Sequence, residues 1–115
     1  PVVFSQVAEF ASTASKVLLC LDSNHTHTHV LRELEIYAPM VSVGSYCIVF
    51  DTLIEELSSE YLASTDRPWE PGNSPRSAID AFLAGSGGER FVVDHSVTNR
   101  LMVTSARGGY LKRVV

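Results

Sequence analysis

Two short apolar runs, each followed directly by an aspartate, constrain the fold of this chain more than any other feature. One run extends from Val17 to Leu21 and the other from Tyr46 to Phe50, and they end at Asp22 and Asp51. Neither run alternates apolar with polar side chains. Such runs are typical of strands that are covered on both faces in a parallel sheet. The sequence therefore predicts two buried strands with an acidic side chain at the end of each.

The segment between the two runs predicts a helix. Residues 23–26 offer several side chains that can cap a helix N-terminus. Val30, Leu31 and Leu34 then fall on one helical face, and Pro39 ends the helix. A strand, a helix and a strand joined by short connections form a βαβ unit, whose crossover is expected to be right-handed.

The remaining segments predict further helices and a C-terminal hairpin. Apolar periodicity predicts a first helix over residues 3–14 and a shorter piece over 53–57, followed by a polar loop over 58–74. Another helix begins with Ser74 as N-cap and ends at Gly85. Two strands, residues 91–93 and 101–104, are close enough in sequence to form an antiparallel hairpin. We therefore expect one α/β domain over residues 1–115, with a Rossmann-like sheet of about four strands, two parallel plus the hairpin, flanked by helices.

Composition excludes several classes of protein. The chain has 115 residues, with 9 basic and 13 acidic side chains, so its formal net charge is −4. Without a basic cluster, we expect no nucleic-acid partner. The longest apolar run is far shorter than the roughly 20 residues that cross a bilayer, so we expect no membrane span, and no signal-peptide pattern opens the chain. Cys20 and Cys47 are expected to be reduced, buried residues of a cytoplasmic protein.

The predicted sheet has no cofactor loop and one open edge. Glycine pairs occur at Gly87-Gly88 and Gly108-Gly109, but neither follows a strand and precedes a helix, as a glycine-rich cofactor loop would. The strand from Val17 to Leu21 is very apolar and has a sequential neighbour on one side only. An exposed edge of this kind favours pairing with a second copy. We expect a homodimer through this strand, with a covering helix as the alternative.

Short segments spread along nearly the whole chain carry a family resemblance. They are LDSNHT at 21–26, VLRELEIYAP at 30–39, VGSY at 43–46, FDT at 50–52, DRPW at 66–69, PGNSP at 71–75 and GYLKR at 109–113. In these segments the chain resembles the cephalosporin hydroxylase family, which has the fold of S-adenosylmethionine-dependent methyltransferases and includes rhamnosyl O-methyltransferases. The resemblance implies methyl transfer to a hydroxyl in complete members. It also implies that this chain corresponds to the C-terminal half only and lacks cofactor-binding residues of its own.

Asp22 and Asp51 are the candidate metal ligands. Neighbouring strands lie about 4.8 Å apart, so carboxylates at two adjacent strand ends could share one hard cation. The resemblance implies such a divalent site, with Mg²⁺ as the ion, made by an acidic residue after the first strand and an acidic pair after the second. Phe50 stands at the first position of that pair and removes one ligand. In the alternative interpretation, Asp22 caps the helix and Asp51 caps a turn.

His25 is the candidate catalytic residue. It opens an alternating run with His27 and His29. If the helix has begun by His25, then His25 and His29 lie one turn apart and could hold a transition metal, although a merely exposed histidine face would show the same pattern. An unperturbed histidine titrates near pH ~6.5, which makes His25 a candidate proton acceptor beside Asp22.

Arg67 and Trp69 are the candidate substrate-binding residues. They lie in a proline-rich loop that could cover an acceptor such as a sugar, with Trp69 stacked on the sugar and Arg67 bound to its polar groups. Alternatively, Trp69 only anchors the loop. Two functions stay open at this point: a methyltransferase-type enzyme, or a non-enzymatic dimeric binding or structural module.

Overall fold

A four-stranded mixed sheet forms the centre of the protein in the computed structural model, which describes residues 2–115. Its strands are β1 (Leu19–Leu21), β2 (Tyr46–Val49), β3 (Phe91–Val93) and β4 (Tyr110–Arg113), in the spatial order β1-β2-β4-β3. β1 and β2 are parallel, whereas β4 is antiparallel to both β2 and β3. The predicted α/β class, with one parallel pair and a C-terminal antiparallel pair, is confirmed.

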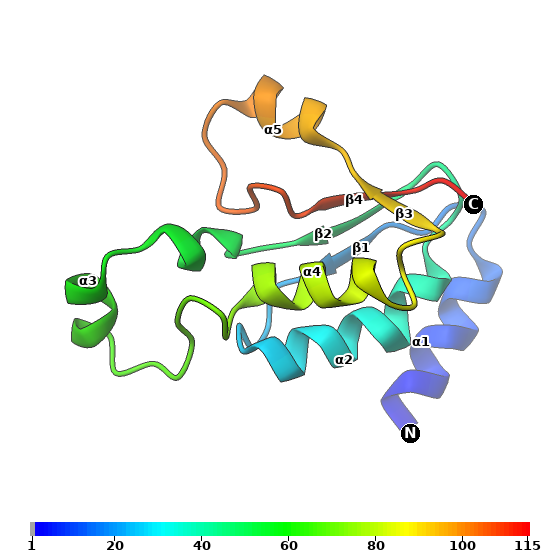
Figure 1. Cartoon of the computed structure of the whole chain (residues 1–115). Helices are drawn as coiled ribbons and strands as arrows, with labels where there is room; N and C mark the ends of the chain where they lie inside the picture. Colours follow the sequence, from blue (N-terminus) through cyan, green and yellow to red (C-terminus); the bar gives the residue numbers. More distant parts are fainter. Residues whose placement is uncertain (1) are drawn as a thin grey trace.

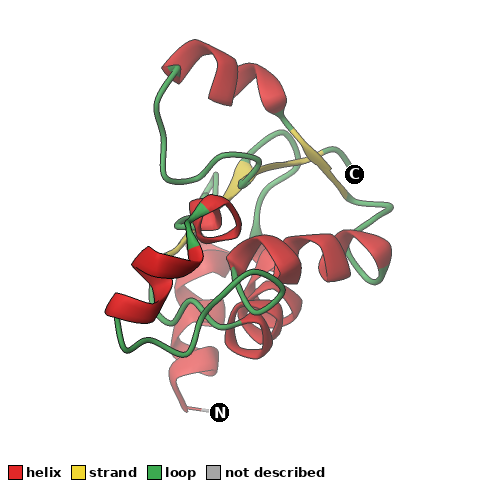
Figure 2. Ribbon diagram, turned by 60° about the vertical axis from the view of Figure 1, so that its left-hand side comes forward, coloured by secondary structure: helices red, strands yellow, loops and turns green. Residues whose placement is uncertain are grey.

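Helices flank the sheet on both sides. Helices α2 (His27–Tyr37) and α4 (Pro75–Ala84) lie side by side against one face, and α5 (His95–Leu101) lies on the opposite side (Figures 1 and 2). Helix α3 (Ser59–Ser64) projects beyond one end of the sheet, and α1 (Val2–Thr13) lies at the other end. Among residues 2–115, none of the helices is long and apolar enough to cross a membrane.

The predicted βαβ unit forms from β1, α2 and β2. Helix α2 begins at His27 and buries Val30 and Leu34. It ends at Tyr37 and continues as a 3₁₀ turn, η1 (Ala38–Met40), that contains Pro39. The apolar face of α2 therefore packs where its periodicity predicted.

The core lies between the sheet and the helix pair. Its largest fully buried side chains include Leu34 on α2, Ile79 and Phe82 on α4, and Phe91 and Leu111 on the sheet. The rings of Phe82 and Phe91 pack with their centroids 5.7 Å apart. Helix α4 starts as predicted, because the Ser74 side chain accepts a hydrogen bond from the Ser77 backbone N–H and Pro75 occupies the first turn.

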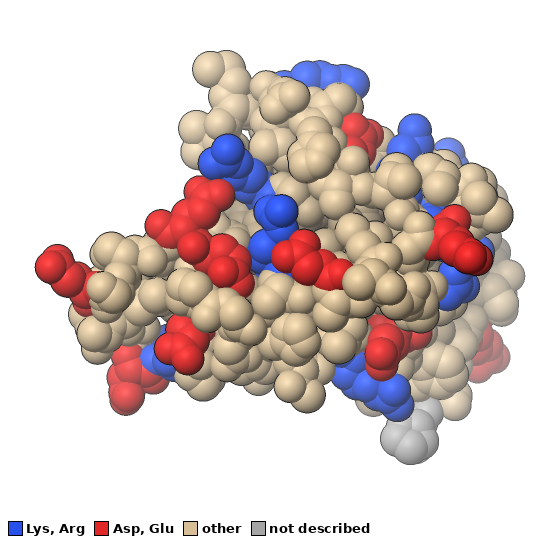
Figure 3. Space-filling view, viewed as in Figure 1, with Lys and Arg blue, Asp and Glu red and all other residues tan. Residues whose placement is uncertain are grey.

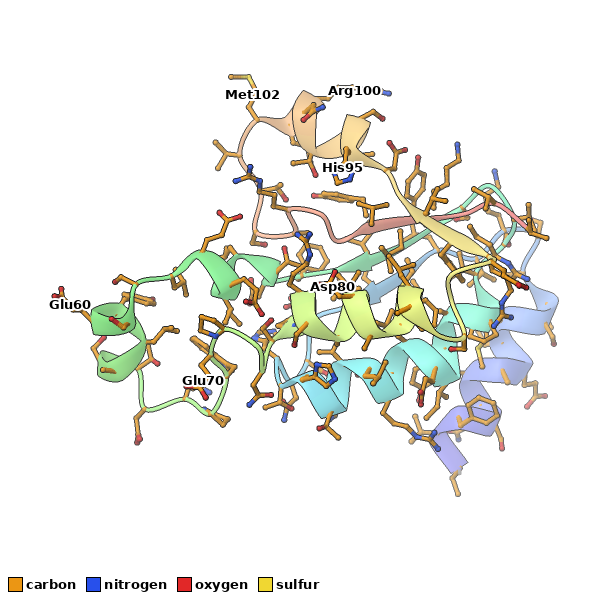
Figure 4. The ribbon with its side chains drawn as sticks, in the orientation of Figure 1. Glu60, Glu70, Asp80, His95, Arg100 and Met102 are labelled. Atoms are coloured by element: carbon orange, nitrogen blue, oxygen red, sulfur yellow. The ribbon has the colours of Figure 1, made fainter. Side chains whose placement is uncertain are left out.

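The predicted strand over residues 101–104 is wrong, and β4 lies nine residues further along. Leu101 ends α5 instead, and Met102 and Val103 are exposed at the tip of the following loop (Figure 4 labels Met102). Helix α5 forms because Asp94 caps it. Hydrogen bonds from Ser96 and then Tyr46 lower the pKa of Asp94 to about 2. The chain thus enters a helix directly after β3 and reaches the sheet again only at β4.

The strand β1 is shorter than predicted and is not covered on both faces. It comprises only Leu19–Leu21, and Leu18 and Cys20 are exposed. Both cysteines are free, as predicted, but only Cys47 is buried, and burial raises the pKa of its thiol to about 12. Cys20 is exposed because it lies on an edge strand, and helix α1 beside it buries none of its own described side chains.

The polar segment after β2 holds more regular structure than predicted. The predicted helical piece forms as a 3₁₀ helix, η2 (Thr52–Glu56). The predicted loop contains α3, which begins where the Ser58 hydroxyl accepts a hydrogen bond from the Tyr61 backbone N–H at 3.2 Å. Residues 65–73 then form the actual loop, which returns to the start of α4 (Figure 1).

Candidate functional site

Asp22, His25 and Asp51 come together at the carboxyl ends of β1 and β2. Asp22 directly follows β1, and Asp51 lies two residues after the end of β2. The His25 ring lies between the two carboxylates, with Nδ1 3.4 Å from Asp51 Oδ2 and Nε2 3.5 Å from Asp22 Oδ1. One potential ligand atom from each residue can be chosen so that all three lie within 4.8 Å of one another. The structure thus brings Asp22, His25 and Asp51 together in one cluster.

The backbone at Asp51 places it at this edge. Its φ of 56° lies in the left-handed region, which few residues other than glycine adopt and which asparagine and aspartate tolerate best. Immediately before it, the Phe50 backbone N–H donates to the Leu21 carbonyl at 3.1 Å, which extends the pairing of β1 and β2. The chain therefore turns sharply out of the sheet at Asp51 and enters η2.

The donor set of this cluster fits a divalent cation. His25 Nε2 is buried and has no hydrogen-bond partner among the described residues, although buried polar atoms normally have one. Two carboxylates supplemented by water are a usual way to bind Mg²⁺ or Mn²⁺. The half-buried Phe50 adds no ligand, so Asp22 and Asp51 would hold such an ion and the His25 ring would lie beside it.

The other two histidines do not join this cluster. Because α2 begins at His27, His25 lies before the helix and does not share a helical face with His29. His29 instead lies 3.3 Å from a carboxylate oxygen of Glu33. His27 Nδ1 makes a 2.8 Å hydrogen bond with the Ser77 hydroxyl of α4. The condition for a metal held by His25 and His29 on one helix face is therefore not met.

Arg67 and Trp69 line the same cleft as the cluster. This cleft, here called the rim cleft, has a volume of about 460 Å³ and is lined by Ser23, Asn24, His25, Asp51, Arg67, Pro68 and Trp69. The Trp69 side chain is half-buried and Arg67 is exposed. Trp69 can therefore both anchor the loop and face a ligand in the cleft. The cleft brings together side chains from the loops after β1, β2 and α3.

Sequence reasoning missed Asn73, which joins the two sides of the rim cleft. Its Oδ1 accepts a hydrogen bond from the His27 backbone N–H at 2.9 Å, and its Nδ2 donates to the Pro68 carbonyl at 3.0 Å. The motif PGNSP at 71–75 signals a turn. Nothing in that motif, however, identifies a partner 46 residues away.

Acidic side chains dominate the surface near this end of the molecule. In Figure 3 they gather on the left, over the region of η2, α3 and the following loop. Glu56, Glu60, Asp66 and Glu70 belong to these segments and are exposed, while Arg107 lies 3.3 Å from Glu56. A surface of this sign attracts cations and disfavours anionic ligands.

The sheet and the cluster define the class of protein. A parallel strand pair with polar side chains at its carboxyl ends is the arrangement in which α/β proteins of the Rossmann type bind ligands. The family described as rhamnosyl O-methyltransferase/CmcI matches residues 1–114. The chain belongs to that family, as the sequence resemblance implied.

Curated relatives support the same assignment. The rhamnosyl O-methyltransferase of Mycobacterium bovis is 31% identical over 100 residues, which cover 85% of this chain and 36% of the relative. The rhamnosyl O-methyltransferase of Mycobacterium tuberculosis matches with the same identity and coverage. The matched residues therefore make up about a third of the length of these relatives. No solved structure matches the chain significantly.

Proposed function

We propose that this chain is the acceptor-binding part of an S-adenosylmethionine-dependent O-methyltransferase and corresponds to the C-terminal half of the family domain. Family membership and the 36% coverage of the relatives support this assignment. S-adenosylmethionine would supply the methyl group in the complete protein. We assign none of the residues of this chain to binding it, because both glycine pairs follow a helix and precede a strand, whereas a cofactor loop follows a strand and precedes a helix.

One observation carries the proposal: the side chains of His25, Asp51, Arg67 and Trp69, from three separate loops, line the rim cleft, and Asp22 lies against His25. Asp22 and Asp51 would hold a divalent cation, Mg²⁺ by family analogy, which would polarise and orient the acceptor hydroxyl. His25, which lines the cleft, would accept the hydroxyl proton. Its Nδ1 faces Asp51 at 3.4 Å, which fixes the orientation of the ring.

The acceptor that fits this cleft is sugar-like. The relatives are named for a rhamnosyl acceptor. Trp69 offers an aromatic face for the C–H face of a sugar ring, and Arg67 offers donors for its hydroxyls. Positioning of this kind accounts for much of the rate enhancement when two bound groups react. We further propose a cytoplasmic location, because both cysteines are free.

Titration calorimetry tests this function on the 115-residue chain. With saturating Mg²⁺, we expect methyl α-rhamnoside to bind with a dissociation constant of about 1 mM. We expect no heat when S-adenosylmethionine is added alone. Absence of sugar binding would contradict the acceptor role. Micromolar binding of S-adenosylmethionine would contradict the assignment to the half without the methyl-donor site.

A second candidate function is a non-enzymatic dimeric module, and the edge around β1 favours it. Within the described residues, β1 pairs with β2 only, and Leu18 next to it is 54% exposed. Phe10 on helix α1 is 78% exposed, and an apolar groove of about 220 Å³ lies between α1 and the start of β1. We propose that a second copy pairs with the edge from Val17 to Leu21.

Light scattering tests the dimer. We expect a mass near twice the 12.6 kDa of one chain, and Leu18→Glu should shift the protein to the monomer because it places a charge on the pairing edge. Leu101→Glu is the matched control, because Leu101 is similarly exposed, at 51% against 54%, but lies on α5. A monomer at every concentration would rule out the dimer.

A further inference from the structure

The loop over residues 65–73 carries Arg67 and Trp69, yet the described contacts that hold it are few. Helix α3, which precedes the loop, projects beyond the end of the sheet (Figure 1). Glu70 and Asn73 close the end of the loop through two backbone hydrogen bonds of 3.1 and 2.8 Å, with Gly72 at a φ of +86° between them. Figure 4 labels Glu70 on the part of the loop that turns back toward the first turns of α2 and α4.

The Asn73 side chain connects this loop to the opposite wall of the rim cleft. Its Nδ2 donates to the carbonyl of Pro68, which stands between Arg67 and Trp69. Its Oδ1 accepts from the backbone N–H of His27, two residues after His25. A single planar amide therefore bonds to both walls, and its rigid geometry relates one wall to the other.

Glu55 holds the residues on either side of Asn73 in place. One carboxylate oxygen of Glu55 accepts hydrogen bonds from the Gly72 backbone N–H at 2.9 Å and from the Ser74 hydroxyl at 2.5 Å. These two residues flank Asn73 in the chain. Because Glu55 belongs to η2, which follows Asp51, the same contacts tie the Asn73 turn to the acidic side of the cluster.

We propose that Asn73 is a positioning residue that sets the distance between the acceptor-binding side chains, Arg67 and Trp69, and the His25 cluster. This inference rests on the proposed function, which assigns the rim cleft to acceptor binding. The hydrogen bonds of Asn73 do not depend on that assignment. Asn73 touches neither reacting group. It acts through the Pro68 carbonyl on one side and the first N–H group of α2 on the other.

Two substitutions separate positioning from helix capping. Asn73→Asp keeps an oxygen that accepts from the His27 N–H but removes the donor to Pro68 and places a negative charge beside that carbonyl. Asn73→Ala removes both hydrogen bonds. Asn99→Asp is the control, since it makes the same chemical change at an exposed position of α5. Aspartate is as good an N-cap group as asparagine, so the start of α2 should survive in Asn73→Asp.

Fluorescence of Trp69, the only tryptophan of the chain, reports on the loop. We expect acrylamide to quench Trp69 about twofold more efficiently in Asn73→Asp than in the native chain, with the thermal midpoint changed by only a few degrees. Methyl α-rhamnoside should bind about 10-fold more weakly, because an offset of an ångström between binding groups is costly. Asn73→Ala should show the same quenching together with a lower thermal midpoint.

The outcomes distinguish this inference from the proposed function. Unchanged quenching in both Asn73 variants would overturn the positioning role, even if the native chain binds the sugar. Equal quenching in Asn73→Asp and the Asn99→Asp control would do the same. If quenching of Trp69 increases in the Asn73 variants but the native chain binds no sugar, the positioning role is supported and the proposed acceptor function is contradicted.

Discussion

Replacing Asp51 by asparagine should weaken divalent cation binding by about 100-fold, which corresponds to about 2.7 kcal/mol. The change removes one of the two carboxylates at the strand ends and leaves Asp22 alone with the imidazole of His25. Asparagine tolerates the left-handed φ of 56° found at this position, so the turn into η2 should persist. The loss would then reflect the missing charge and not an altered backbone.

Thermal unfolding with and without Mg²⁺ or Mn²⁺ measures this effect. A cation at 100 times its dissociation constant stabilises the native protein by about 2.7 kcal/mol, and this gain should nearly vanish in Asp51→Asn. Asp80→Asn is the matched control (Figure 4 labels Asp80), because it removes one exposed carboxylate that pairs with Arg76 on α4, at 3.3 Å. Equal stabilisation of both variants by the cation would show that the ion binds elsewhere.

Replacing Gly109 by alanine should lower the free energy of unfolding by about 3 kcal/mol, because the site has no room for a methyl group. A Cβ atom there would lie 2.2 Å from the Val49 carbonyl oxygen and 3.0 Å from the Ala106 carbonyl oxygen. Both are backbone atoms, which cannot rotate away as a side chain can. The Val49 N–H also donates to the Gly109 carbonyl at 2.9 Å, so relieving the clash would pull β2 and the start of β4 apart.

Guanidinium unfolding compares this variant with Gly85→Ala. Gly85 has a φ of −115°, and the nearest atom to a Cβ there, the Ala81 carbonyl oxygen, lies at 3.4 Å. We expect Gly85→Ala to change the free energy of unfolding by less than about 1 kcal/mol. Because Val49 lies two residues before Asp51, Gly109→Ala should also weaken cation binding. Equal stability of the two variants would contradict the close approach at Gly109.

The candidate site was largely visible in the sequence, because its acidic residues follow apolar runs. A run that ends in aspartate marks where a strand leaves the sheet, and two such parallel strands must end at the same edge. That argument placed Asp22 and Asp51 together, and the short interval to His25 kept the histidine close. Arg67 and Trp69 were selected for the chemistry of their side chains. Their spacing in the sequence did not predict that they would line the rim cleft.

The C-terminal strand shows where local pattern failed. Residues 101–104 and 110–113 both contain apolar and β-branched or aromatic side chains, so either could have been the last strand. Tertiary pairing selects the second, since Tyr110–Arg113 finds β2 on one side and β3 on the other. Of the first, Leu101 ends α5 and the other three residues belong to the following loop. Asp94 caps α5 and accepts a hydrogen bond from Tyr46, 48 residues earlier.

The sequence by itself determined the βαβ unit, the start of α4 and the acidic ends of the parallel strands, because each depends on neighbours within a few residues. The tertiary structure decided the position of β4, the exposure of Cys20 and the contacts of Asn73. Each of these depends on what lies nearby in space and not in the sequence. β4 depends on the strands on either side of it, Cys20 on its position at the edge of the sheet, and Asn73 on a backbone N–H 46 residues away. Local periodicity carries no information about such partners.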